Sequence, residues 1–336
     1  MIERLVGMQA QVPSNPYVAL WARLRDFDPH ELSRLIAGRG AVRAQLMRST
    51  IHLVTARDAL ALHPLTAPVL ARTFAGQAQF LRALVAAGVA LEEVVAAGRA
   101  LLAEAPRTRA ELAAALGPRW PDVAPATLAQ AVTFNSPLVQ VPPRGLWSES
   151  GAARWALTEG WLGAELDPEP SIDAVVLRYL AAFGPATASD IRTWSGFTGL
   201  RPVLEQLRPR LRSFRDEQGR ELFDVPGAPL PDPETPAPPR FLPEYDNLGL
   251  SHADRARIFN GLGPGLPFPT GTWIGSLFAD GFFRAWWRIT VQDGGATLAI
   301  DGFTPSSRDP AGMEDEIAAE GERLRSLIAT RAAPDP

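Results

Sequence analysis

The sequence repeats one order of local patterns: helix signals followed by two short β-type runs. This order limits the possible folds more than any single motif does. It is clearest in residues 171–226. SIDAVVLRYLAAFG has the apolar spacing of an amphipathic helix, with Ser171 as its N-cap and Gly184 as its stop. Two more helical stretches follow, and two β-type runs then flank the turn at 217–219. Three helices and a hairpin in this order predict a winged helix.

The same order recurs twice nearer the N-terminus. Residues 90–162 contain three helix patterns and then a strand pair around a double proline. Residues 1–60 contain two helix patterns, each with a capping residue (Asn15, Asp28) and an early proline, followed by two strands in AVRAQLMRSTIHLV. We therefore predict three tandem winged-helix units, at residues 1–60, 90–162 and 171–226, with connecting helices in residues 61–89.

The pattern changes after residue 226. Residues 227–239 are rich in proline and poor in apolar residues, which is typical of a linker. Between residues 240 and 330, short alternating runs broken by Asp-Gly turns predict a small antiparallel β-barrel or sheet, and a last amphipathic stretch predicts a C-terminal helix. The predicted fold class is α+β: tandem winged-helix units followed by this barrel or sheet and the helix.

Cysteine and lysine are missing from the sequence, and their absence excludes several kinds of catalytic and metal-binding chemistry. Without cysteine the chain has no disulfide, no thiolate nucleophile and no sulfur-bound zinc. All 33 basic residues are arginine, so no side chain can form a Schiff base or serve as a P-loop lysine. The four histidines are scattered, and the glycine-rich stretch 261–271 contains prolines typical of a loop. We predict no metal and no cofactor.

The net charge of −4 is distributed unevenly. Residues 1–60 hold eight arginines and five acidic residues, whereas residues 241–336 hold eight arginines and thirteen acidic residues. An anionic partner is therefore expected to bind the N-terminal half. No apolar run approaches the length of a membrane span, and the first residues do not resemble a signal peptide. We expect a cytoplasmic, nucleoid-associated monomer with no membrane partner.

The stretch VGMQAQVPSNP places two glutamines, Gln9 and Gln11, around one alanine before a proline-containing turn. On stereochemistry alone, these glutamines are typical of a solvated helix end. Arginines between residues 208 and 215 are suited to phosphate contacts or to a solvated surface balanced by nearby acids. The run at 286–288, Trp-Trp-Arg, is suited to stacking on a base, although paired tryptophans in a strand more often pack in a sheet.

Four stretches together resemble the AlkZ/YcaQ group of winged-helix DNA glycosylases. They are LVGMQAQVPSNPYVALWARL, VRAQLMRSTIHLV, VPPRGLW and FLPEYDNLGLSHADRARI, and the likeness extends from residue 2 to residue 325. The resemblance implies tandem winged helices and a β-barrel that form a concave surface for duplex DNA. It also implies excision of bulky N7-alkylated purines, including crosslinked ones. One departure is that family members carry a further helix ahead of the first motif, where this sequence has eight residues before Gln9.

The catalytic signature of this group is two polar residues around an aliphatic one, Gln-x-Gln in the AlkZ branch and Gln-x-Asp in the YcaQ branch. Gln9-Ala10-Gln11 resembles the AlkZ branch. An amide is no general base near neutral pH, but an N7-alkylated purine is already cationic and leaves without a strong acid. Glutamine carbonyls can orient a water and offer partial negative charge to an oxocarbenium-like sugar. With no lysine, we expect hydrolysis without strand cleavage.

The resemblance also gives the hairpin at residues 43–54 a role. We expect it to contact double-stranded DNA carrying alkylated purines through Arg43, Arg48, Thr50 and His52. Two other functions stay open on the sequence. One is a non-catalytic winged-helix DNA-binding protein, such as a transcriptional regulator, since winged helices usually bind duplex DNA without chemistry. The other is a protein that sequesters an alkylating natural product.

Overall fold

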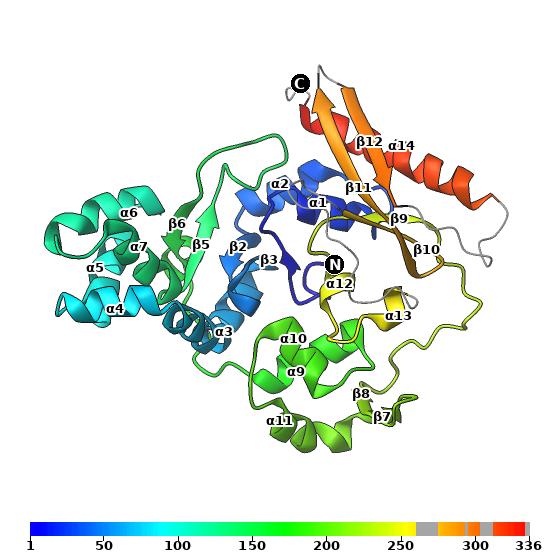
Figure 1. Ribbon diagram of the computed structural model, residues 1–336, viewed down its shortest axis with the longest axis horizontal. Helices are drawn as coiled ribbons and strands as arrows, with labels where there is room; N and C mark the ends of the chain where they lie inside the picture. The colour runs from blue at the N-terminus through cyan, green and yellow to red at the C-terminus, as the bar shows by residue number, and fades with distance from the viewer. Residues whose placement is uncertain (260–274, 293–294, 303–311, 333–336) are drawn as a thin grey trace.

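The computed structural model describes residues 1–259, 275–292, 295–302 and 312–332 (Figure 1). It is a mixed structure of helices and antiparallel sheets, which confirms the mixed class but does not test the winged-helix assignment. The predicted loop at 261–271 lies outside these residues, as do the first two residues of the predicted Asp-Gly-Gly turn. None of the described helices is long and apolar enough to cross a membrane.

A six-stranded sheet lies at the centre of the protein and combines strands of the first two predicted units. Its order is β1-β3-β2-β5-β6-β4. The strands are β1 (Met8–Gln9), β2 (Ala41–Gln45), β3 (Ile51–Thr55), β4 (Arg107–Thr108), β5 (Leu138–Val141) and β6 (Arg154–Leu157). Strand β2 pairs with β5, where Arg43 lies opposite Gln140 and Ala44 opposite Val139. The first two predicted units therefore share one sheet.

Eight helices precede the third unit and surround this sheet (Figure 1). They are α1 (Asn15–Trp21), α2 (Pro29–Ala37), α3 (Ala56–Gly76), α4 (Ala78–Ala86), α5 (Leu91–Glu104), α6 (Arg109–Leu116), α7 (Pro125–Phe134) and α8 (Thr158–Leu162), with 3-10 turns η1 (Met47–Ser49) and η2 (Gly117–Arg119). Asp28 caps α2 as predicted, by accepting a hydrogen bond from the backbone of His30. The prediction for α1 is wrong by one residue, because Ser14 occupies the N-cap position and Asn15 lies inside the helix.

Residues 171–226 form the predicted order of three helices and a hairpin. The elements are α9 (Ile172–Phe183), α10 (Ala188–Ser195), α11 (Leu200–Leu207), η3 (Arg208–Arg210), β7 (Arg212–Arg215) and β8 (Glu221–Asp224). Ser171 caps α9 as predicted, and the helix ends before Gly184. The core of this unit is continuous with one face of the central sheet, because Tyr179 and Trp194 belong to the same apolar cluster as Val42.

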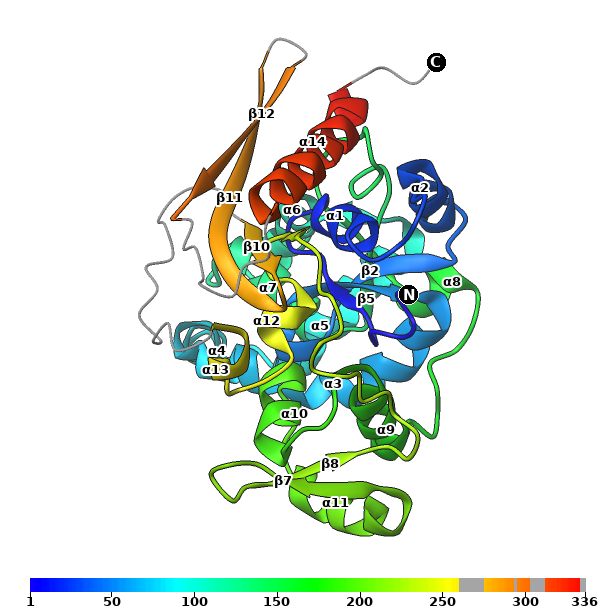
Figure 2. The same cartoon turned by 90° about the vertical axis from the view of Figure 1, so that its right-hand side faces the viewer.

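After a stretch without helix or strand at residues 225–239, the chain enters a second sheet. Its strands are β9 (Arg240–Leu242), β10 (Gly275–Ala279), β11 (Phe282–Gln292) and β12 (Gly295–Asp301), in the order β12-β11-β10-β9. The remaining helices are α12 (Asn247–Leu250), α13 (Ala256–Phe259) and α14 (Met313–Ala332), and α14 lies along this sheet (Figure 2). Within the described residues the sheet is open, with β9 and β12 at its edges, so it matches the predicted sheet rather than a closed barrel.

Candidate active site

Gln9 lies in β1, the two-residue strand at one edge of the central sheet, and pairs with His52 of β3. The strand follows a turn in which Val6 and Gly7 both have positive φ, 53° and 98°. A Cβ on Gly7 would lie 2.6 Å from Cγ1 of Val54, a distance that side chains do not adopt. The turn that brings Gln9 against β3 therefore requires a glycine.

The side chain of Gln9 is 8% exposed and lies beneath Arg48. Nη2 of Arg48 donates a hydrogen bond to Oε1 of Gln9 at 2.8 Å and lies 3.4 Å from Nε2 of His52. Nη1 of the same guanidinium donates to the backbone carbonyl of Trp194 in α10. Arg48 sits in the turn between β2 and β3 with a φ of 53°. This turn therefore places the Arg48 guanidinium beside Gln9, and the same guanidinium connects the turn to α10 of the third unit.

Burial determines the protonation states of Arg48 and His52. It lowers the pKa of Arg48 to about 10, helped by the charge of Arg255, so the guanidinium stays protonated at neutral pH. Burial, and then the charge of Arg48, lowers the pKa of His52 to about 3, so this imidazole is neutral. Nδ1 of His52 lies 3.0 Å from the Thr50 carbonyl, which can only accept. The proton is therefore on Nδ1, and Nε2 accepts from Arg48.

Gln11 is exposed, in contrast to Gln9, and lies at a cavity of about 360 Å³. Its Oε1 accepts a hydrogen bond from the backbone N–H of Ile51 at 3.2 Å. A carbonyl oxygen has two lone pairs, so Gln11 keeps one for a further donor. The cavity walls combine amides and hydroxyls with apolar side chains: Gln45, Gln140, Ser49 and Thr108, together with Arg109, Trp155, Ile51, Ala152 and Ala153. The cavity can therefore hold a polar group beside Gln11.

The four residues predicted to contact DNA occupy different environments. Arg43 and His52 are each 2% exposed, so their side chains contact the protein interior, and their burial does not support direct contact with a duplex. Nη2 of Arg43 donates to the carbonyl of Ala10 at 2.8 Å, between the two glutamines. Arg48 and Thr50 are partly exposed at the hairpin turn. The buried Arg43 and His52 therefore contact the glutamine motif from inside the protein. The hairpin turn carries the two accessible residues, Arg48 and Thr50.

The four stretches that carry the family resemblance meet around β1. The second stretch supplies Arg43 and Arg48, described above. The third supplies Gly145, which approaches the Arg43 side chain so closely that a Cβ there would lie 2.7 Å from Cδ of Arg43. The fourth supplies Asn247, whose Nδ2 donates to the carbonyl of Gly7 at 2.9 Å. Residues separated by up to 240 positions therefore converge on the Gln-Ala-Gln motif.

Comparison with known proteins identifies the family of this chain. A sequence profile described as "DNA glycosylase AlkZ-like" matches residues 2–327. The chain belongs to the AlkZ-like DNA glycosylase family. Among solved structures, the Streptomyces sahachiroi DNA glycosylase AlkZ is similar, with 22% sequence identity and a TM-score of 0.72, over 98% of this chain and 89% of that one. At this identity the likeness shows a shared fold. No curated protein matches the sequence.

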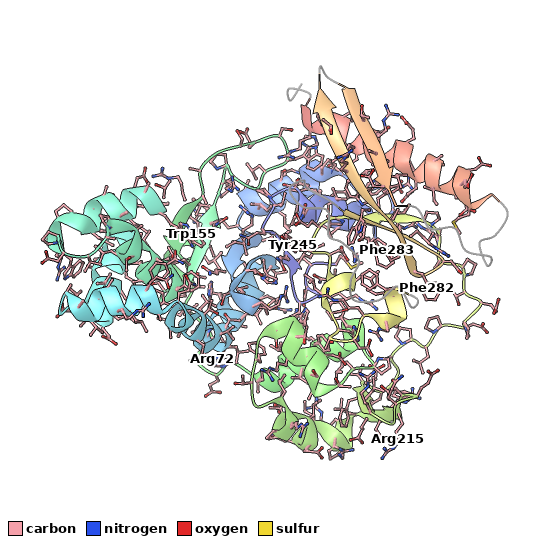
Figure 3. The ribbon with its side chains drawn as sticks, viewed as in Figure 1. Arg72, Trp155, Arg215, Tyr245, Phe282 and Phe283 are labelled. Atoms are coloured by element: carbon pink, nitrogen blue, oxygen red, sulfur yellow. The ribbon has the colours of Figure 1, made fainter. Side chains whose placement is uncertain are left out.

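Other candidate groups of this AlkZ-like chain do not belong to the site. Arg208 donates to both Glu205 and Glu221 at 2.8 Å, which fits the solvated surface considered from the sequence. Arg215 lies at the end of the third unit away from Trp155 of the cavity (Figure 3). Trp287 is fully buried, so that tryptophan packs in the second sheet. The described residues contain no cluster of three or more His, Asp or Glu side chains placed to hold a metal ion.

Sequence reasoning missed three contributors to the site of this AlkZ-like protein. It assigned no role to Asn247, although the stretch YDNLGLSH was part of the resemblance. It expected Arg43 on the surface, because a lone arginine in a basic segment gives no sign that its partner is the Ala10 carbonyl. It did not connect the carbonyl of Trp194 with Arg48. All three are contacts to backbone groups, which leave no pattern in a single sequence.

Proposed function

We propose that this protein is a monofunctional DNA glycosylase that hydrolyses the N-glycosidic bond of N7-alkylated purines, including bulky adducts and interstrand crosslinks. The observation that carries the proposal is the pair of environments in Gln9-Ala10-Gln11. One glutamine is buried and oriented by Arg48, and the other is exposed at a cavity that contains amide and hydroxyl groups. Membership of the AlkZ-like family supports the reaction class.

The chemistry of the lesion matches what two amides can do. Alkylation at N7 makes the purine cationic, so the electron pair of the breaking C1′–N9 bond neutralises the leaving group and no general acid is needed. A water oxygen then bonds to C1′ and releases its proton to solvent, because an amide cannot hold it near neutral pH. The exposed amide of Gln11 orients this water. The carbonyl dipoles of both glutamines stabilise the positive charge that develops on the sugar.

The Arg48 guanidinium beside Gln9 needs an explanation, because its positive charge would destabilise an oxocarbenium ion by electrostatic repulsion. Arg48 is partly exposed at the hairpin turn, and DNA brings phosphates that pair well with a guanidinium. We propose that Arg48 and Thr50 contact the backbone of the damaged duplex. A phosphate on Arg48 offsets its charge, while its hydrogen bond keeps Oε1 of Gln9 in place. The buried Arg43 and His52 act by holding this hairpin.

We also propose that the units of three helices and a hairpin are winged helices that bind duplex DNA. The support is the element order in residues 172–224 and a bridge between Ala186 and Phe223 that joins the segment before α10 to the hairpin. The N-terminal half, which contains β1, carries the excess of arginine over acidic residues. This distribution favours DNA binding on the side of the glutamine motif.

The test is release of the free base from a duplex that carries one N7-methylguanine, followed by a series of larger N7 adducts and a nitrogen-mustard crosslink. We expect release by the wild type and a loss of at least about 100-fold in the Gln9→Ala, Gln11→Ala double variant, the size of effect seen when positioned dipoles are removed. Gln79→Ala is the matched control, because Gln79 is an exposed glutamine on α4.

The outcomes separate the alternatives. Full activity in the double variant would remove the motif from the mechanism. A sequence-specific footprint on undamaged DNA, without base release from any lesion, would favour a non-catalytic DNA-binding protein. Binding of a free alkylating compound without DNA would favour sequestration.

A further inference from the structure

The stretch from Glu244 to Ala253, which we call the clasp segment, contacts both sides of the Gln9 site. On one side, the buried Asn247 donates from Nδ2 to the carbonyl of Gly7, two residues before Gln9. The segment has two further contacts with the N-terminal region. Nδ2 of Asn15 donates to the carbonyl of Glu244 at 2.7 Å, and Arg23 donates to both carboxylate oxygens of Asp246 at 2.6 and 2.8 Å.

On the other side, the clasp segment holds α10. The backbone N–H of Ala253 donates to Oδ1 of Asp190 at 2.9 Å, in the first turn of that helix. The hydroxyl of Tyr179 in α9 donates to the carbonyl of Ser251. The last turn of α10 contains Trp194, whose carbonyl accepts from Arg48. One segment therefore anchors the start of the helix whose end holds Arg48 over Gln9.

We propose that the clasp segment sets the position of β1 relative to α10, and that Asn247 is a positioning residue for the reaction. This inference rests on the proposed role of Gln9. The strand is two residues long and, within the described residues, lies at the edge of the sheet, so its ladder with β3 is short. The turn before it contains two residues of positive φ, and the backbone N–H groups of residues 5–7 donate only to carbonyls of residues 1–3, so these bonds do not attach the turn to the clasp segment. The amide of Asn247 attaches this turn to the clasp segment, in addition to the contacts of residues 8–10 with β2 and β3.

The chemistry of this contact predicts which change breaks it. Asn247→Asp keeps the shape of the side chain and replaces the N–H donor with an oxygen that repels the Gly7 carbonyl. Asn247→Ala removes the donor without adding a charge. In both variants Gly7 and Gln9 lose their anchor, and Gln9 shifts under Arg48. Because Asn247 is buried, it does not touch DNA, so affinity for the duplex should change little.

The experiment measures the single-turnover rate of base release and the Kd for lesion-containing duplex. We expect Asn247→Ala to lower the rate constant at least about tenfold with a change in Kd below about twofold. Such a loss is expected when a reacting group is misplaced. Asn135→Ala is the control, because Asn135 also donates from Nδ2 to a backbone carbonyl, that of Ala131, away from the site. It should leave the rate constant unchanged.

Amide hydrogen exchange of residues 8–10 supplies a readout that needs no catalysis. The inference predicts faster exchange of these residues in Asn247→Ala, with unchanged exchange in β2. Unchanged exchange at residues 8–10 would overturn the inference, as would a rate loss matched by an equal loss of affinity. If the wild type releases no base from any lesion, the proposed function fails, and hydrogen exchange alone still decides whether Asn247 anchors β1.

Discussion

At the scale of single residues, the two glutamines of the motif differ in what each contributes to stability. Oε1 of Gln9 accepts from the partly buried Arg48, whereas the side chain of Gln11 is exposed. Gln9→Ala leaves Nη2 of Arg48 without this acceptor and should lower the free energy of unfolding by about 1–3 kcal/mol. Gln11→Ala should change it by less than about 0.5 kcal/mol. Urea unfolding of the two variants measures both values, and an equal loss would contradict the burial difference.

Two of the three buried histidines, His52 and His63, give the stability of the protein a defined pH dependence. Burial lowers the pKa of His63 to about 3, and that of His52 to about 3 with the help of Arg48. An unfolded histidine titrates near 6.5, so below that pH the unfolded state binds protons that the folded state excludes. Stability therefore falls as the pH decreases from about 6.5 toward 3, by about 1.4 kcal/mol per pH unit for each histidine.

The variant His63→Gln tests this contribution. Nε2 of His63 lies 2.9 Å from Oγ1 of Thr158, and a glutamine amide can keep a hydrogen bond there without titrating. We expect a shallower fall of the unfolding free energy between pH 6 and pH 4 than in the wild type. Parallel urea titrations across this range measure it. An unchanged slope would show that His63 is not buried as a neutral ring.

At the scale of elements, a wall of the cavity beside Gln11 can be altered without loss of the fold. Gln140 in β5 is buried, and its Oε1 has no hydrogen-bond donor in the described part of the chain. Gln140→Leu removes this acceptor and keeps a similar volume, so the free energy of unfolding should stay within about 1 kcal/mol of wild type or rise. We expect Gln140→Leu to slow the release of polar adducts more than the release of N7-methylguanine, which lowers the ratio of the two rates relative to wild type. A ratio equal to that of the wild type would show that the cavity does not select the lesion.

Local elements were accessible from the sequence because their signals are local. The hairpin at residues 212–224 was predicted from two β-type runs around a turn, and α9 from its capping serine and apolar spacing. The pairing of β2 with β5 was not predicted, since Arg43 and Gln140 lie far apart in sequence and no pattern specifies their register. Gln9 and Gln11 were predicted as site residues from the family resemblance, because two amides carry no chemical signature of their own.

At the scale of the whole molecule, the absence of lysine determines the expected product. A bifunctional glycosylase attacks the sugar with an amine and then breaks the strand by β-elimination. Lysine is missing from the entire sequence, so the only amine in this chain is its amino terminus. We expect an abasic strand that stays intact until alkali or an endonuclease is added. Borohydride during turnover should trap no covalent protein–DNA adduct, and efficient trapping would contradict the hydrolytic mechanism.

The two glutamines of the motif differ in the cost of placing a negative charge. Gln9 lies in β1 beside Arg48, whereas Gln11 lies beyond the end of that strand. Position 11 is also solvated, so a carboxylate there carries no desolvation penalty, whereas a carboxylate at position 9 would be drawn into an ion pair with Arg48. We therefore expect a carboxylate to be accepted more readily at position 11, which faces the cavity, than at position 9.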